Sequence, residues 1–282
     1  MTRRLLIVNA DDYGLTPAIS RGILACHDAG IVTSVSVLAT GPAVATTAPW
    51  LADRPGLEVG AHLAAVGEDP PLLTAREIPT LVDRRGSFRM SWRSFVLAVA
   101  AGRVDPDDIT REFGAQLDRL IGDLGLRPRH LDTHQHLHLC PPVARVVTEL
   151  ALRRGIRAVR VPTSAARGPR AIGVRRWSRA LAARLTAAGL VFPAAFGGLD
   201  EAGRLDHDVL QALIARLAAG PAASIEVNCH PGTPTAADRA YYAWNYGWET
   251  EVAGLTDPRL RHAVDRLGLQ LGGYAELTGL VP

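Results

Sequence analysis

The sequence contains no lysine, so all 31 basic residues are arginine, set against 28 acidic residues for a net charge of +3. Because these arginines are scattered among acids without interleaved aromatic residues, we expect no nucleic-acid partner. The three cysteines lack CxxC spacing, which argues against a disulfide framework and a cysteine zinc site. The apolar run at 5–8 is too short for a signal peptide or a membrane span, so we predict a cytoplasmic protein without stable membrane insertion.

Short apolar segments alternate with amphipathic helical patterns along the whole chain. The patterns predict strands at 5–8, 31–39, 57–63, 158–161, 190–194, 224–229 and 269–274, and a strand with its outgoing loop at 130–138. They predict helices at 17–29, 43–52, 92–101, 106–124, 142–154, 175–188, 206–219 and 258–267. Such alternation implies parallel strand pairing with right-handed crossovers. We therefore predict an α/β fold, a TIM-like (β/α) barrel that is distorted or incompletely closed, in a single domain over residues 1–282.

Two segments break the alternation. Residues 64–90 contain prolines and glycines that interrupt every period, and a loop of this length inside a compact domain usually forms a lid or a wall of a binding site. Residues 163–205 are rich in arginine, alanine and glycine and are expected to form an irregular insertion. Both segments are candidates for contact with a ligand.

Polar side chains stand at the carboxyl ends of four predicted strands, where parallel sheets and barrels carry their ligands. They are Asp11 with Asp12, then His62, then Asp132 with His134, His136 and His138, and finally His230. The paired acids alone would equally fit a turn with a helix N-cap. Alternate residues of an extended chain point the same way, so these four residues from Asp132 to His138 are expected to share one face for as long as the strand lasts, and to form half of a metal site. Histidine and carboxylate together suit zinc, iron, manganese or magnesium.

The motifs around these residues resemble a known family. NADDYG at 9–14, GIVTS at 30–34, VGAHL around His62, HLDTHQHLH at 130–138, VRVP at 159–162 and CHPG at 229–232 resemble the YdjC-like carbohydrate deacetylases. That family includes chitooligosaccharide deacetylases and hopanoid-biosynthesis-associated deacetylases, and EIPTLVD, GSFR and RAVRVP are closer to the latter. The resemblance implies hydrolysis of an N-acetyl group on an amino sugar or glycoconjugate, with release of acetate and a free amine.

The resemblance also implies roles for individual residues. Asp12, His62 and His134 would hold one divalent metal ion, magnesium or zinc, with manganese or cobalt as alternatives. Asp11 would be the general base that deprotonates a metal-bound water, and His230 a candidate general acid. Tyr13 and Thr133 are mild departures from the family pattern, which often has Phe and Ser there. The family further suggests a homodimer or larger assembly.

Other polar residues of the motifs are expected to support the ligands or to contact substrate. These residues are Asp132, His136, His138 and Arg160. A carboxylate such as Asp132 commonly orients a ligating imidazole. Arg160 could contact a polar or anionic part of the substrate or form a structural salt bridge. The aromatic residues Trp244, Tyr246 and Trp248 could cover a sugar or lipid portion of the substrate, or pack at a subunit interface.

Two alternative functions make different demands on the sequence. A metal-dependent phosphoesterase or another amidohydrolase on a similar barrel would favour a second metal, a bridging lysine or an HxH pair on the first strand, and this chain has neither the lysine nor that pair. A non-catalytic binding protein would have lost some of the five candidate metal-binding and catalytic residues, and all five are present.

Overall fold

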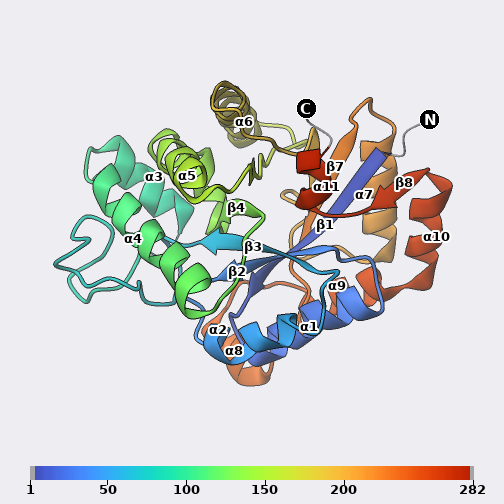
Figure 1. Cartoon of the computed structure of the whole chain (residues 1–282), viewed down its shortest axis with the longest axis horizontal. Helices are drawn as coiled ribbons and strands as arrows, with labels where there is room; N and C mark the ends of the chain where they lie inside the picture. The colour runs from blue at the N-terminus through green and yellow to red at the C-terminus, as the bar shows by residue number, and fades with distance from the viewer. Residues whose placement is uncertain (1–3, 90, 280–282) are drawn as a thin grey trace.

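The computed structural model describes residues 4–89 and 91–279, so Met90, the last residue of the expected 64–90 loop, lies outside the described part. Its strands are β1 (Arg4–Tyr13), β2 (Ser34–Leu38), β3 (Glu58–Leu63), β4 (His130–Thr133), β5 (Ala158–Val159), β6 (Ala195–Gly197), β7 (Ser224–Cys229) and β8 (Leu269–Leu271). All pairings are parallel, in the order β5-β4-β3-β2-β1-β7-β6, with β8 beside β1. The sheet is curled and stays open between β5 and β6, which confirms the predicted α/β fold with an incompletely closed barrel (Figure 1).

Strand β1 is the centre of the sheet. Leu5 and Leu6 pair with both β7 and β8, Arg4 pairs with β8, and β2 begins to pair with the strand only at Asn9. Leu6 and Val8 pack into the main core, whereas Leu5 and Ile7 pack into a second cluster with Tyr274. Because both faces of β1 are covered, its sequence is a continuous apolar run rather than an alternating one.

Helices surround the curled sheet, with α3, α5 and α6 on one side of the molecule and α7 and α10 on the other (Figure 1). The α-helices are α1 (Pro17–Asp28), α2 (Val44–Thr47), α3 (Trp92–Ala100), α4 (Pro106–Asp118), α5 (Pro141–Arg154), α6 (Pro169–Ala187), α7 (His207–Ala218), α8 (Ala236–Tyr241), α9 (Trp248–Thr256), α10 (Pro258–Arg266) and α11 (Tyr274–Gly279). Local signals fix several ends. The Thr16 hydroxyl accepts the Ile19 N–H to begin α1, and α5 ends at Gly155 with φ 67°.

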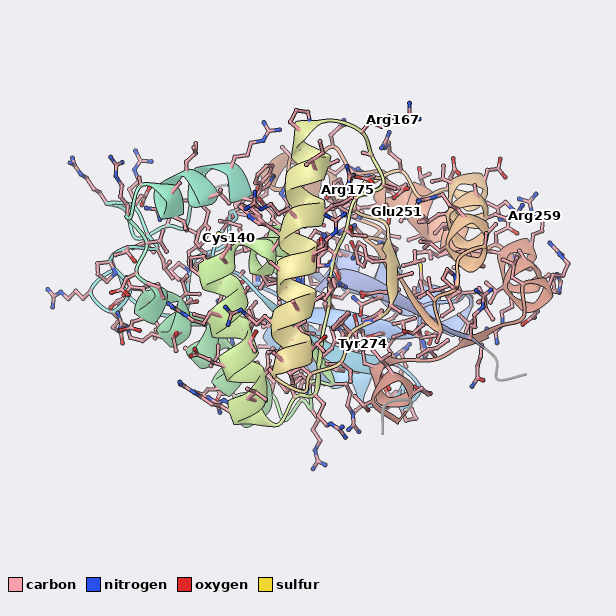
Figure 2. All side chains as sticks on the ribbon, turned by 90° about the horizontal axis from the view of Figure 1, so that it is seen from above. Cys140, Arg167, Arg175, Glu251, Arg259 and Tyr274 are labelled. Atoms are coloured by element: carbon pink, nitrogen blue, oxygen red, sulfur yellow. The ribbon has the colours of Figure 1, made fainter. Side chains whose placement is uncertain are left out.

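Several predicted boundaries were wrong. Helix α6 begins at Pro169 instead of 175, because a proline in the first turn needs no N–H partner there. The strand expected at 190–194 lies at 195–197, and Val191 forms only an isolated bridge with Ala158. The last strand ends at Leu271, and helix α4 ends at Asp118 before a π-helical segment, Arg119–Asp123. Helices α8 and α9 were not predicted. Figure 2 shows α6 in front of the sheet, with α5 alongside it.

The described part of the 64–90 segment contains no named helix or strand, as expected, but side chains of α4 hold it in place. The Glu112 carboxylate accepts the backbone N–H groups of Leu72 and Leu73. The Asp108 carboxylate accepts both the N–H and the hydroxyl of Thr80. Since these acceptors are buried, the segment forms a defined wall beside the carboxyl end of β3.

Candidate active site

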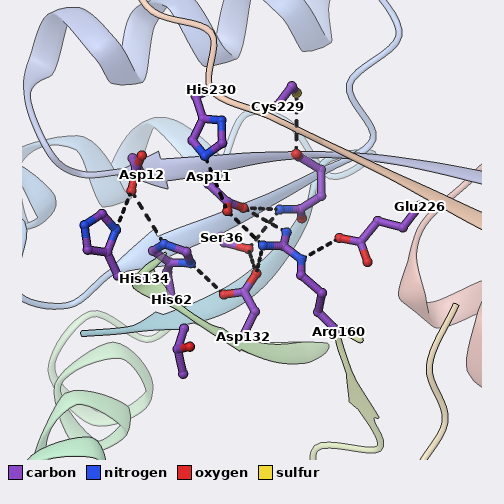
Figure 3. A network of polar contacts seen from close by, with 12 residues as sticks. Asp11, Asp12, Ser36, His62, Asp132, His134, Arg160, Glu226, Cys229 and His230 are labelled. Atoms are coloured by element: carbon purple, nitrogen blue, oxygen red, sulfur yellow. Dashed lines mark hydrogen bonds and ion pairs between the residues drawn. The ribbon is translucent and has the colours of Figure 1, made fainter. Parts of the chain in front are cut away.

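A bulge in β1 brings two adjacent carboxylates to the same site. The β1–β2 register shifts between Ala10 and Tyr13, and Asp12 has φ 68°, in the left-handed region. Successive residues of a regular strand point to opposite faces, whereas a bulge re-aims them. Asp11 and Asp12 therefore both reach the carboxyl end of the sheet, where both are buried (Figure 3).

Asp12, His62 and His134 come together from three separate parts of the chain. Asp12 Oδ1 lies 3.3 Å from His134 Nδ1 and 3.5 Å from His62 Nε2. One possible ligand atom from each of the three residues lies within 4.8 Å of the other two. Asp12 Oδ1 is buried and has no hydrogen-bond partner among the described residues. Ligand atoms bonded at about 2.0–2.2 Å around a tetrahedral ion lie about 3.3–3.5 Å apart, which matches both separations. The three side chains therefore fit a divalent metal ion.

The histidine run that follows β4 is not extended, so the prediction that 132–138 share one face was wrong. Strand β4 ends at Thr133, and Gln135 and His136 take φ values of 51° and 54° within a short 3₁₀ segment, His134–Leu139. The Thr133 hydroxyl accepts the backbone N–H of His138, which closes this turn. The three histidines therefore enter three different environments.

His134 lies beside Asp12, His136 lines the pocket, and His138 is fully buried behind it. His138 Nε2 lies 3.1 Å from the backbone oxygen of Arg160, which can only accept, so Nε2 carries the proton. Nδ1 of His138 must then accept from the Thr133 hydroxyl, 2.7 Å away. Burial lowers the pKa of His138 to about 3, so this ring stays neutral and holds β4 against the residue after β5.

A single buried cation, Arg160, connects three carboxylates (Figure 3). Its two terminal nitrogens donate to both oxygens of Asp11 at 2.8 Å. Its Nε donates to Glu226 at 2.7 Å, and one terminal nitrogen also lies 2.8 Å from Asp132. Arg160 is therefore oriented by three ion pairs.

Asp132 connects Arg160 to the candidate metal ligand His62. It accepts from His62 Nδ1 at 2.7 Å, leaving His62 Nε2 directed at Asp12. It also accepts from the Ser36 hydroxyl at 2.6 Å. Burial would lower the pKa of His62, but the carboxylates of Asp132 and Asp11 outweigh it and raise the pKa to about 9. A carboxylate in this position fixes the orientation of a ligating imidazole.

The charge on Asp11 is stabilised by the same cation. Burial alone would raise its pKa, but Arg160 and His62 hold the pKa of Asp11 well below its usual range. Asn9 donates to Oδ1 at 2.8 Å, and Arg160 donates to each oxygen. A carboxylate has about four acceptor positions, so Oδ2 keeps one for a further donor. Asp11 is thus an ionised acceptor at the pocket wall.

His230 follows β7 and lies next to Asp11 in the pocket. Its Nε2 lies 3.9 Å from Asp11 Oδ2, and its backbone N–H donates to Glu251 at 2.5 Å. Burial raises the pKa of Glu251, and His230 opposes that rise. The ring of Tyr246 packs edge-on against His230, with centroids 5.0 Å apart. The backbone bond and the ring contact together fix the position of the imidazole.

These residues line a cavity of about 540 Å³ with two unlike ends. The polar end is formed by the two aspartates and by His62, His134 and His230. The other end is largely apolar and lies between α3 and α6, where its lining includes Trp92, Val96, Val174 and Trp177. The 163–205 segment, which was expected to form an irregular insertion, thus contributes directly to the pocket.

The aromatic segment after β7 divides between core and pocket. Trp248 is buried in the main core, whereas Trp244 and Tyr246 line the cavity. The Trp244 ring lies 5.5 Å from that of His134, and its Nε1–H donates to Glu68 at 2.9 Å. Tyr242 donates its hydroxyl to Asp69 at 2.9 Å. The 64–90 segment therefore holds Trp244 in place beside the candidate metal ligands.

Comparison with known proteins assigns the chain to a family. The sequence profile described as YdjC-like protein matches residues 5–266. The chain belongs to the YdjC-like family. A carbohydrate deacetylase of Mus musculus is 34% identical, over 98% of this chain and 96% of its own length. A chitooligosaccharide deacetylase of Enterobacter sp. (strain 638) is 30% identical, over 97% of this chain and 99% of its own.

A solved structure shares the YdjC-like fold of this chain. It is a protein of Enterococcus faecalis V583 described as a "putative cellobiose-phosphate cleavage protein", with a TM-score of 0.81 and 24% identity. The alignment covers 98% of this chain and 99% of that one. At this level of identity the comparison supports the fold.

Sequence reasoning missed several residues of this YdjC-like site. Glu226 and Glu251 received no role, although Glu226 stands in the middle of an otherwise uncharged buried strand. A charged residue in such a strand needs a partner of opposite charge, and this was a usable signal. Glu251, Ser36 and Glu68 carried no comparable signal, because their partners lie far away in the sequence.

Proposed function

We propose that this chain is a metal-dependent carbohydrate N-deacetylase. It would hydrolyse the acetamide of an amino sugar or glycoconjugate to acetate and a free amine. The observation that carries the proposal is the convergence of Asp12, His62 and His134 on one pocket, with Asp11 and His230 facing each other at its wall. Relatives that match nearly the whole chain and bear the name carbohydrate deacetylase support the reaction class.

Asp12, His62 and His134 would hold one divalent ion. Bound there, the ion would supply Lewis-acid polarisation of the amide carbonyl. The separations between ligand atoms are closer to those around tetrahedral zinc than to the about 3.0 Å expected between neighbouring ligands of octahedral magnesium. A second group of possible ligands, Asp11, His62 and Asp132, is already neutralised by Arg160. One ion is therefore proposed, in contrast to a two-metal phosphoesterase.

Asp11 would orient the attacking water and accept its proton. Its ionised state is secured by Arg160, and the remaining acceptor position on Oδ2 is available for a water molecule. The fixed ion pair keeps the carboxylate in one orientation, which favours attack from one direction. The cost is a weaker base, because the same cation lowers the pKa of Asp11.

His230 would give a proton to the departing nitrogen. An amide nitrogen leaves readily only after protonation, so the reaction needs a general acid on the side opposite the nucleophile. His230 lines the pocket, with its Nε2 3.9 Å from Asp11 Oδ2, and its backbone N–H donates to the Glu251 carboxylate.

The experiment that tests the proposal measures acetate release from N-acetylglucosamine oligomers by the purified protein. Removing metal with a chelator should abolish release, and adding back zinc, magnesium, manganese or cobalt should restore it. His134→Ala should bind no stoichiometric metal, whereas His262→Ala, an exposed histidine on α10, should bind as the parent does. Full activity in demetallated protein would refute metal dependence.

A further prediction concerns Trp244 and its partner. Aromatic faces stack on sugar rings, and the Glu68 carboxylate fixes the indole plane beside His134. Glu68→Ala should raise KM for an N-acetylated oligosaccharide about fivefold, as expected for loss of roughly 1 kcal/mol of binding, with kcat nearly unchanged. The matched control is Tyr241→Phe, which removes an exposed hydroxyl that donates to the Glu68 backbone instead. An equal change in both variants would contradict a role for the Trp244 contact.

A further inference from the structure

Two stretches of the chain carry arginine without any acid. Residues 84–104 contain five arginines and residues 163–199 contain six, yet neither stretch contains an aspartate or glutamate. The expectation that arginines are scattered among acids is therefore wrong for these two stretches. Within their described part, 84–89, 91–104 and 163–199, none of these arginines forms an ion pair with a carboxylate.

The two stretches meet at the apolar end of the pocket. The guanidinium of Arg170, in α6, lies 5.3 Å from the ring centre of Trp92, in α3. Arg93 lies 5.5 Å from the same ring. Figure 2 looks onto this side of the molecule, with Arg167 and Arg175 at α6 in front. One arginine from each stretch, Arg93 and Arg170, thus lines this end of the pocket.

Exposed aliphatic side chains occur on the same two helices. Leu97 of α3 is 70% exposed and Ile172 of α6 is 60% exposed, and they are two of the four large hydrophobic residues in the described part with such exposure. We use the name entrance face for the pocket-lining residues Trp92, Arg93 and Arg170 together with the exposed Leu97 and Ile172 of the same two helices. It combines aliphatic, aromatic and cationic side chains without any negative charge.

We propose that the entrance face binds the surface of an anionic lipid bilayer. Helices that lie on membranes present aliphatic and aromatic side chains to the acyl boundary and arginines to lipid phosphates, which is the composition found here. The phosphates of a nucleic acid would pair with the arginines, but a nucleic acid would not cover the exposed aliphatic side chains of Leu97 and Ile172. Within residues 4–89 and 91–279 no helix has the length and hydropathy to cross a bilayer, so the contact is peripheral. The pocket would then open toward the lipid.

The proposal is tested by sedimentation of the purified protein with lipid vesicles. Vesicles of phosphatidylcholine and phosphatidylglycerol in equal parts should bind the protein, and vesicles of phosphatidylcholine alone should bind it far less. Binding should weaken as salt rises, because screening acts on exposed charges. Each arginine near an anionic surface strengthens binding about fivefold, so the double variant Arg93→Glu, Arg170→Glu should bind at least about tenfold more weakly.

Two control variants distinguish binding through the entrance face from binding through positive charge elsewhere on the surface. The variant Arg261→Glu, Arg266→Glu makes the same charge change on α10, on the other side of the molecule, and should bind as the parent does (Figure 1). Leu97→Ser with Ile172→Ser leaves the charge unchanged and should also weaken binding. Equal loss in the α10 variant, no loss in the serine variant, or tighter binding to duplex DNA than to anionic vesicles would overturn the proposal. Because binding is measured without substrate, its failure is distinct from failure of the deacetylase proposal.

Discussion

Replacing Asp11 with asparagine should lower kcat by about 10²–10⁴-fold, the usual contribution of a positioned general base. The amide keeps the shape of the carboxylate and a hydrogen bond with Arg160, but it cannot accept a proton from water. Since Asp11 is not among the proposed metal ligands, metal content should stay at the parental level. Steady-state acetate release and elemental analysis of the same preparation measure the two quantities.

Asp12→Asn provides the matched comparison, because it makes the same chemical change one residue along the same bulge. This variant should lose both metal and activity, since an amide oxygen is a poorer ligand than a carboxylate. Loss of metal in Asp11→Asn with retention in Asp12→Asn would show that the two roles are assigned the wrong way round.

Replacing Arg160 with methionine should destabilise the protein by about 3–5 kcal/mol, the range for removing one partner of a buried ion pair. Methionine fills a similar volume, so the loss reports charge more than packing. Asp11, Asp132 and Glu226 would then lie in a buried site without the guanidinium that pairs with all three. Urea unfolding, with the free energy extrapolated to water, measures the effect.

A second substitution tests the cause of that loss. Arg160→Met combined with Glu226→Gln removes one of the stranded carboxylates and should recover part of the stability. Arg259→Met, at an exposed ion pair with Asp257, should leave the stability almost unchanged, because solvent screens such a pair. Equal destabilisation by Arg160→Met and Arg259→Met would contradict the interpretation of Arg160 as the central cation of the site.

The sequence predicted the elements that local patterns determine. The apolar run of β1, the glycine at the end of α5 and the polar residues at four strand ends are all local signals, and they give the barrel and the parts of its site. The partners of Arg160 could not be predicted, because Asp11 lies 149 residues away and the contact depends on the closure of the sheet.

Two local features also escaped prediction for physical reasons. The rule of alternating faces fails at Asp11 and Asp12, where the bulge turns neighbouring residues toward the same site. It fails again after Thr133, because the hydroxyl of that residue accepts a backbone N–H and ends the extended chain. Periodicity describes regular backbone, and both parts of the site lie where the backbone is irregular.

Because the sheet is open between β5 and β6, the segment that connects these two strands can be exchanged for another. No strand pairing joins β5 to β6, and in the described residues the backbone on the two sides meets in an isolated β-bridge between Ala158 and Val191. Residues 163–189, which include α6, can therefore differ in length or sequence without shifting the register of the other strands. Exchange of this segment between relatives is thus a route to new substrate preferences that leaves Asp11, Asp12 and their partners in place.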